Sequence, residues 1–272
     1  CAAELGISYV ELCCPHNIGK LGVDRTLDTL AEAKLKVACV SSGSALYRNG
    51  GSRNDQDRLL EAVELAHRTG ALFVNAYFGF YHTRDDDRAI DTYKKLLEPC
   101  LRLAADYKVT IVLENEFNAF GWDKAASDIT RRPMALHRLF TETGSSYFRL
   151  NFDVCNCYFA GVEPFPYAYE LLRPFIAYCH LKDGSRYDSD VAAVNPVSGW
   201  QFYSDFDREY VHRPMGEGAI PWNAFLTRLR SDGYNGFLTL EPHSEASIAR
   251  AAWSQAAAYV RRLLSNEGNN IC

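Results

Sequence analysis

Short apolar runs alternate with amphipathic stretches along almost the whole chain. Seven runs are rich in β-branched and aromatic residues, which is typical of buried strands; they lie at 9–14, 37–42, 73–78, 110–115, 148–154, 176–182 and 237–241. Between them, apolar residues recur at helical spacing at 25–34, 55–70, 89–107, 124–144, 219–233 and 245–265. Strands that alternate with helices predict βα units and a parallel sheet.

The ends of the strands favour a closed barrel over an open sheet. An open doubly wound sheet would carry a glycine-rich phosphate loop after its first strand, and the sequence contains no GxGxxG or GxxxxGK[ST] motif. We therefore expect an α/β fold of the (β/α)8 TIM-barrel type, with residues 1–272 as a single domain. Because only seven strands are visible and CAAELG is typical of a helix that ends at Gly6, we expect the first strand upstream of Cys1.

One stretch, residues 184–218, departs from this rhythm. It is long, aromatic and of mixed charge, and it is interrupted by proline and glycine. On a barrel it would form a long rim loop after the seventh strand, where such loops serve as lids or bind ligands. The alternative, an insertion without a function, stays open.

The composition narrows the class of protein. Apolar residues make up 47% and charged residues 23% of the chain, and the net charge of −5 argues against a nucleic-acid surface, which needs a basic stripe. No apolar stretch is long enough to span a bilayer. The nine cysteines form no paired CxxC framework, so we expect free thiols in a cytoplasmic protein, with a Cys-ligated zinc site as the alternative. We expect neither nucleic acid nor a membrane as a partner.

Four of the strand-like runs end in a residue that can bind a metal: Glu114, Asp153, His180 and Glu241. At the carboxyl rim of a barrel these side chains would converge, and three carboxylates would repel one another without a cation between them. The donor set suits Mn²⁺, which we expect, or Mg²⁺, Co²⁺ or Zn²⁺. Any one of the four could instead be a rim residue paired with Arg or Lys, but four at matching positions favour a divalent-metal site.

The strings LENEFN, NFDVCN, HLKDG, MGEGAIPW and LTLEPH resemble those of the xylose-isomerase-like TIM-barrel superfamily of sugar isomerases and epimerases. The resemblance extends from AAELGISYVELC to the last helix. It implies that Glu114, Asp153, His180 and Glu241 hold a divalent cation at the ends of strands five to eight. It also implies that Glu114 and Glu241 lie on opposite faces of the substrate and act as acid and base.

The implied reaction is proton abstraction next to a carbonyl of a sugar or polyol ketone, through a metal-bound enediolate. Return of the proton to the adjacent carbon isomerises the substrate, and return from the opposite face epimerises it. The resembling ketose epimerases often carry His where this chain has Asn156, and an Arg where it has Arg186. Since Asn cannot titrate, Asn156 weakens the assignment of the chain as a plain ketose epimerase. Asn156 and Arg186 both become candidate substrate contacts.

Further candidates for substrate binding lie near the same strand ends. Lys182 shares a face with His180 and could bind a substrate oxygen, or it could form a salt bridge to Glu116 or Asp183. The remaining candidates share a position near the rim and a polar or aromatic side chain: His16, Glu116, Trp122 and His243. The alternative is a structural role, which is the more common one for a lone His near a rim or for an aromatic residue near a strand end.

The same machinery also serves elimination. A metal-dependent lyase, of the inosose-dehydratase type or resembling the catalytic subunit of C-glycoside deglycosidases, is the main alternative, and the latter would require a small partner subunit. An endonuclease-IV-like enzyme with several zinc ions and a non-catalytic carbohydrate-binding barrel are remote alternatives. For every enzyme considered except the nuclease, the expected substrate is a small sugar or glycoside. We also expect the protein to form a homo-oligomer.

Overall fold

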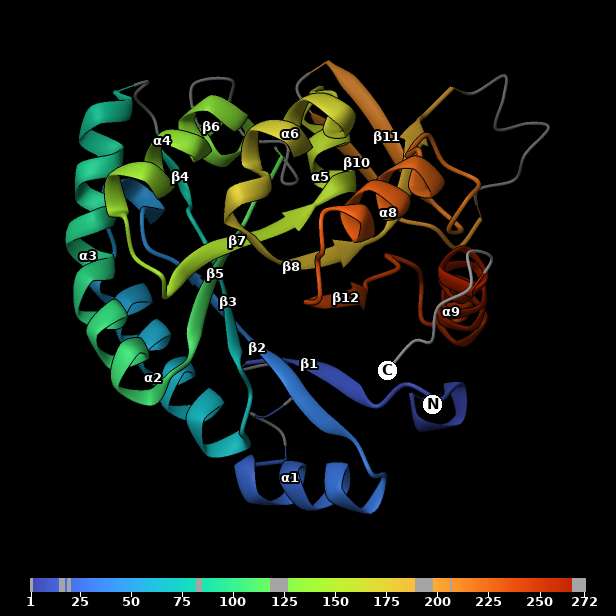
Figure 1. Ribbon diagram of the computed structural model, residues 1–272, viewed down its shortest axis with the longest axis horizontal. Helices are drawn as coiled ribbons and strands as arrows, with labels where there is room; N and C mark the ends of the chain where they lie inside the picture. Colours follow the sequence, from blue (N-terminus) through green and yellow to red (C-terminus); the bar gives the residue numbers. More distant parts are fainter. Residues whose placement is uncertain are drawn as a thin grey trace.

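A computed structural model describes residues 2–14, 18, 21–81, 85–117, 127–188, 198–205 and 207–265. Seven parallel strands form one curved sheet, and neighbours in the sheet follow the order of the chain (Figure 1). They are β1 (Tyr9–Cys13), β2 (Lys36–Ala45), β3 (Phe73–Tyr77), β5 (Thr110–Glu114), β7 (Phe148–Asp153), β8 (Ile176–Leu181) and β12 (Phe237–Leu240). This nearly closed barrel confirms the predicted α/β barrel and all seven predicted strands; in the described part of the chain, the edge strands β1 and β12 do not pair.

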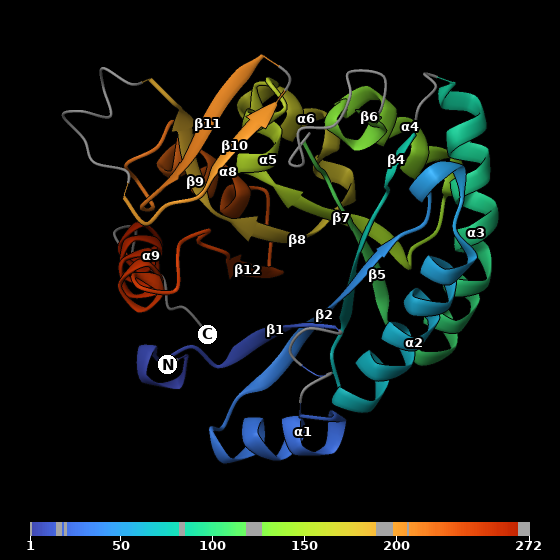
Figure 2. The same cartoon turned by 180° about the vertical axis from the view of Figure 1, so that it is seen from behind.

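Helices cover the outside of the sheet (Figures 1 and 2). They are α1 (Val23–Glu32), α2 (Arg53–Thr69), α3 (Asp86–Tyr107), α4 (Pro133–Thr143), α5 (Val154–Phe159), α6 (Tyr169–Leu172), α8 (Trp222–Ser231) and α9 (Ala249–Ser265). Their apolar faces join the outer face of the sheet in one large core. Among the described residues, no helix is both long and apolar enough to cross a membrane.

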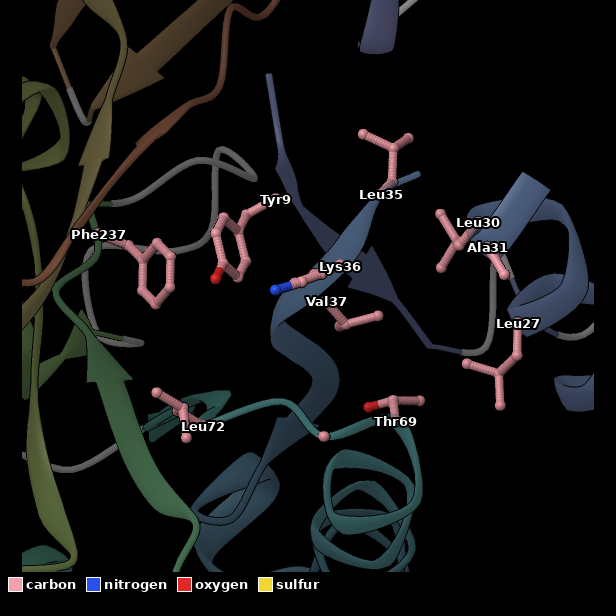
Figure 3. Close-up of a pocket in the computed structure, with 11 residues that line it drawn as sticks. Tyr9, Leu27, Leu30, Ala31, Leu35, Lys36, Val37, Thr69, Leu72 and Phe237 are labelled. Carbon is pink, nitrogen blue, oxygen red and sulfur yellow. The ribbon is translucent and has the colours of Figure 1, made fainter. Parts of the chain in front are cut away.

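The interior of the barrel is filled by aromatic side chains at the amino-terminal ends of the strands. Tyr9 and Phe237, from the two edge strands, pack with ring centroids 5.0 Å apart, and Phe73 contacts Tyr178 at 5.4 Å. A hollow of about 460 Å³ opens at this end of the sheet, beside α1 (Figure 3). Most residues that line it are apolar; the polar side chains are those of Tyr9, Lys36 and Thr69. We therefore look for catalytic side chains at the opposite, carboxyl end of the strands.

Described parts of the expected rim loop 184–218 form a small sheet. Strands β9 (Asp183–Arg186), β11 (Arg208–Arg213) and β10 (Phe202–Asp205) pair antiparallel in the order β10-β11-β9. Because side chains alternate along a strand, one face of this sheet carries Tyr210 and His212, which pack against Phe159 of α5. A two-stranded pair, β4 (Phe80–Tyr81) and β6 (Ser127–Asp128), lies elsewhere on the rim.

The expected helix 124–144 was too long. Its described part contains β6 and a short 3-10 helix, Ile129–Arg131, and α4 begins only at Pro133, which tolerates the first helical position because it has no N–H to donate. The expected helix end at Gly6 is present as a 3-10 turn, Ala3–Leu5, with Gly6 in the left-handed conformation.

Candidate metal centre

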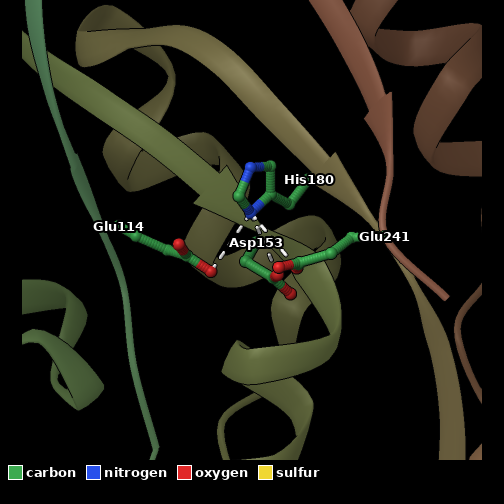
Figure 4. Close-up of side chains that lie close together, drawn as sticks. All are labelled: Glu114, Asp153, His180 and Glu241. Carbon is green, nitrogen blue, oxygen red and sulfur yellow. Dashed lines mark ion pairs between the residues drawn. The ribbon is translucent and has the colours of Figure 1, made fainter. Parts of the chain in front are cut away.

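The four expected metal ligands lie together at the carboxyl ends of the strands: Glu114 in β5, Asp153 in β7, His180 in β8 and Glu241 directly after β12. One donor atom of each residue lies within 4.8 Å of the donor atoms of the other three. The register explains this proximity, since Asp153 is the direct neighbour of His180 across β7 and β8. In Figure 4 the imidazole of His180 points Nδ1 toward the three carboxylates.

Asp153 divides its two oxygens between a helix and the cluster. Oδ1 accepts a hydrogen bond from the backbone N–H of Asn156 at 2.8 Å and so caps the amino terminus of α5. Oδ2 faces the cluster and, although buried, accepts no oriented hydrogen bond from the described residues. The helix therefore fixes the side chain and leaves Oδ2 facing the cluster, where the Lys182 ammonium lies 2.7 Å away.

His180 is oriented by a carboxylate on the far side of its ring. Nε2 lies 3.0 Å from Oε2 of Glu11 in β1, and the same oxygen accepts a hydrogen bond from the Tyr178 hydroxyl at 3.0 Å. Since a carboxylate only accepts, Nε2 carries the hydrogen, and Nδ1 remains for the cluster. Nδ1 is buried and has no oriented hydrogen-bond partner among the described residues.

Amide side chains hold Glu114. Asn75 donates to Oε2 at 2.8 Å, and Asn156 donates to Oε1 at 3.1 Å. Asn151 in turn donates to Asn75 Oδ1 at 3.2 Å. Donors on both oxygens favour the ionised carboxylate and restrict its rotation, so Glu114 is preorganised toward the cluster.

Lys182 brings a positive charge into the same cluster. Its Nζ lies 2.7 Å from Asp153 Oδ2, 2.7 Å from Glu241 Oε2 and 3.7 Å from Glu114 Oε1. Its ion pairs are thus with the cluster carboxylates rather than with Glu116 or Asp183. A buried ammonium next to three carboxylates offsets part of their charge.

The charge balance of the cluster fits a divalent cation. Burial opposes ionisation of Glu241, but Lys182 and His180 lower its pKa well below the ordinary value. Burial raises the pKa of Asp153 to about 6. Burial disfavours the imidazolium of His180, yet the carboxylates of Glu114, Glu241 and Glu11 raise its pKa well above the ordinary value. The carboxylates thus favour a positive charge at His180 Nδ1, the position where a metal ion would replace the proton.

The structure brings several expected substrate contacts to this centre. Asn156 and Lys182 touch the ligands directly, and His243 places Nε2 3.6 Å from Glu241 Oε1. Glu116 is half-buried; burial and the nearby Glu114 carboxylate raise its pKa well above the ordinary value. His16 and Trp122 lie outside the described residues.

Arg186 has a different environment. It lines a second hollow, of about 470 Å³, together with Arg208 and Tyr210, between the small sheet and the segment after α5. Among the described residues, no ion pair or hydrogen bond joins Arg186 to the four-residue cluster.

Sequence reasoning missed Glu11, Asn75 and His212. Glu11 and Asn75 interrupt the apolar runs YVELCC and FVNAYF, and a polar residue inside a buried strand requires a polar partner. That signal could have indicated an interior hydrogen-bond network. His212 lies in β11, within the stretch expected to be a loop, where no periodicity pointed to it.

Comparisons with known proteins agree with this geometry. The family model described as xylose isomerase-like TIM barrel matches residues 1–263. Among curated proteins, none matches the chain.

Solved structures share the fold at low sequence identity. A xylose isomerase domain protein from Planctomyces limnophilus is 16% identical with a TM-score of 0.74, over 99% of this chain and 92% of that one. A 3-keto-D-glucoside 4-epimerase from E. coli is 14% identical with a TM-score of 0.68, over 95% and 90%. A probable 3-DHS dehydratase from Bacillus anthracis is 16% identical with a TM-score of 0.68, over 96% and 90%.

Proposed function

The chain belongs to the xylose isomerase-like TIM barrel family, and we propose that it is a divalent-metal-dependent isomerase or epimerase acting on a sugar or polyol ketone. The observation that carries the proposal is the convergence of donor atoms from Glu114, Asp153, His180 and Glu241, which all lie within 4.8 Å of one another. Sugar epimerases with the same fold are among the structural neighbours.

These four residues would hold a divalent cation, which when bound would polarise the substrate carbonyl and acidify the neighbouring C–H. Glu114 and Glu241 approach the centre from opposite sides (Figure 4). Glu241 is 34% exposed and Glu114 only 2%, so Glu241 is the carboxylate that a substrate entering from solvent meets first. We assign Glu241 as the first proton acceptor. Glu241 itself could return the proton to the adjacent carbon, whereas Glu114, which is ionised in the free protein, would return a proton from the other side only after taking one up from a substrate hydroxyl group or from solvent.

A lyase is the second candidate, and Lys182 favours it. Its Nζ lies 2.7 Å from Glu241 Oε2, so an ammonium that can protonate a departing oxygen sits beside the proposed base. Asn156, which cannot titrate, is tied to Glu114 and to the backbone carbonyl of Asn115. A dehydratase is also among the structural neighbours. If the activity is that of a deglycosidase, a small second chain should co-purify.

The test is product identity from a panel of ketoses, inososes and 3-keto-glycosides with Mn²⁺, run in D₂O. Proton transfer predicts deuterium at the carbon next to the carbonyl, with an isomer or epimer as product; expulsion of a substituent would identify the lyase. Glu241→Gln and Glu114→Gln should each lower kcat roughly 10²–10⁴-fold. Glu245→Gln, an exposed change on the same segment, is the control. Full activity and full metal content in Glu241→Gln would show that the assignment is wrong.

A further inference from the structure

A pair of imidazole rings lies beside the metal centre. His212 of β11 and His243, which follows Glu241 by two residues, have ring centroids 4.6 Å apart at an interplanar angle of 40°. Backbone hydrogen bonds join the two segments, since Gln201 N–H donates to the His243 carbonyl and His212 N–H donates to the Gln201 carbonyl. The small sheet β9–β11 therefore fixes the two rings relative to each other.

The hydrogen bonds of His212 define its tautomer. Nδ1 lies 3.2 Å from the backbone carbonyl oxygen of Asp183, and because a carbonyl only accepts, Nδ1 carries the hydrogen. Burial, His243 and Lys182 lower the pKa of His212 well below the ordinary value, so the ring is neutral. Nε2 is then a hydrogen-bond acceptor, and it is buried without a hydrogen-bond partner in the described part of the chain.

Both ring nitrogens of His243 face oxygen atoms. The Tyr203 hydroxyl donates its one hydrogen to Gln201 Oε1 at 2.6 Å, so at 3.2 Å from His243 Nδ1 its oxygen accepts. The second nitrogen, Nε2, faces Glu241 Oε1 at 3.6 Å. His243 is 28% exposed, whereas His212 is 1% exposed.

Aromatic rings surround His212, so leaving its Nε2 without a hydrogen-bond donor is energetically unfavourable. Phe159 and Tyr203 pack against the ring at 4.9 and 5.3 Å between centroids. A buried acceptor that lacks a donor is unfavourable, and the hydroxyl group of a sugar or polyol is a donor of the right size. Among the described residues, His212 belongs to no group that could hold a metal ion.

We propose that His212 is a specificity-determining residue whose Nε2 accepts a hydrogen bond from a hydroxyl group of a polyhydroxylated ligand at the metal centre. The inference rests on the proposed function for the location of the ligand. It adds a binding role for β11 that is separate from proton transfer at carbon.

Two substitutions separate the two sides of the ring. In His212→Asn the amide can still donate to the Asp183 carbonyl, as Nδ1–H does, but no atom replaces Nε2. In His212→Gln the longer side chain can place an amide oxygen near the position of Nε2. His67→Asn, an exposed change on α2, is the matched control.

Binding of xylitol, myo-inositol and methyl α-glucoside to the Mg²⁺-loaded protein is measured by calorimetry, with the Kd for Mg²⁺ and the melting temperature of each variant. We expect His212→Asn to weaken binding of the best polyol at least 10-fold at unchanged Mg²⁺ affinity, His212→Gln to recover part of it, and His67→Asn to bind as the wild type does. Because these ligands have no ketone, the result stands whether or not the protein transfers protons at carbon.

Wild-type polyol affinity in His212→Asn would overturn the proposal, as would failure of all three polyols to bind the wild type. A parallel loss of Mg²⁺ affinity would also overturn it, since His212 would then support the metal. Ring ¹⁵N NMR gives an independent check: Nε2 of His212 should be unprotonated in the free protein and should shift when the polyol binds. A hydrogen on Nε2 in the free protein would contradict the premise.

Discussion

At the scale of single residues, Glu11 shows how a side chain acts on the metal centre without entering it. Glu11 Oε2 lies 3.0 Å from His180 Nε2, so Nδ1 is left as the nitrogen that faces the candidate metal site. In Glu11→Gln the acceptor is neutral and the basicity of the imidazole falls, so we expect the Kd for Mn²⁺ to rise roughly 10–100-fold. Calorimetric titration with Mn²⁺ measures this, with the exposed change Glu32→Gln as control. An unchanged Kd would mean that Glu11 does not position His180.

The contrast between Glu114 and Glu11 shows what the sequence can predict at this scale. Glu114 ends an apolar run, and any parallel barrel brings such ends to one rim. Glu11 lies inside a strand, and its partner His180 is 169 residues away in sequence. The choice of that partner depends on how the barrel curves, which no local pattern encodes.

Asp128 gives a pH dependence that is separate from the metal centre. Burial raises its pKa to about 6 from an ordinary value of 3.8. Between these two values the folded chain holds a proton that the unfolded chain has released, so the free energy of unfolding falls as the pH rises from about 4 to about 6, by up to about 3 kcal/mol. Asp128→Asn should lack this part of the decline.

Urea unfolding at several pH values, as the difference between wild type and variant, measures the effect of Asp128. The exposed change Asp28→Asn on α1 is the control and should leave the profile unaltered. A constant difference between wild type and Asp128→Asn from pH 4 to pH 7 would contradict the prediction.

At the scale of elements, α5 and the small sheet are among the parts that were not predicted, together with α6 and the β4–β6 pair. Helix α5 begins at Val154, with no loop between strand and helix, because Asp153 is the last residue of β7 and its carboxylate caps the helix. The string NFDVCN therefore predicted Asp153 as a candidate ligand but gave no signal for the helix α5 that follows it. Strands β9, β10 and β11 pair with one another. Polar residues such as Glu209 and Arg213 interrupt their apolar pattern, so the pattern did not predict these strands.

The GEG segment after β11 is held by Asp183, the residue after Lys182. Asp183 Oδ2 accepts the N–H groups of Gly216 at 2.8 Å and Gly218 at 3.3 Å. A Cβ atom at Gly218 would lie 2.0 Å from Asp183 Oδ1. We therefore expect Gly218→Ala to displace the Asp183 carboxylate, to cost about 1–3 kcal/mol of stability, and to disturb Lys182.

Thermal unfolding and the Kd for Mn²⁺ measure both effects of Gly218→Ala. Gly22→Ala is the control: it strains a left-handed backbone with no heavy atom within 4 Å of the new Cβ, so it should lower stability while metal affinity stays unchanged. If Gly218→Ala behaves as Gly22→Ala does, the GEG segment has no influence on the metal centre.

At the scale of the whole molecule, the barrel was predictable because each strand is a compact apolar run and each helix has an apolar face. The convergence of the four candidate metal ligands follows from that architecture alone. What the sequence did not show is how the charges balance inside, with Lys182 paired to Asp153 and Glu241. That balance decides how the protein behaves without a metal.

Metal removal should destabilise the barrel without unfolding it. Ligands from β5, β7, β8 and the end of β12 meet at one point, so a cation that binds only the folded chain stabilises all four strands together. At a free Mn²⁺ concentration 100-fold above its Kd the gain is about 2.7 kcal/mol, or roughly 5–11 °C in melting temperature for a chain of this size. Because Lys182 offsets part of the carboxylate charge, the EDTA-treated protein should still unfold cooperatively at the lower temperature.

Asp153→Asn isolates the metal contribution to this shift. The amide oxygen can still cap α5 at the Asn156 N–H, while the oxygen that faces the cluster is lost as an anionic donor. Scanning calorimetry of the wild type and this variant, each with EDTA and with Mn²⁺, should therefore show a metal-dependent shift in the wild type and little or none in Asp153→Asn. Equal melting temperatures of the wild type with and without Mn²⁺ would mean that the four side chains do not form a metal site, because a cation bound by them would favour the folded chain by mass action.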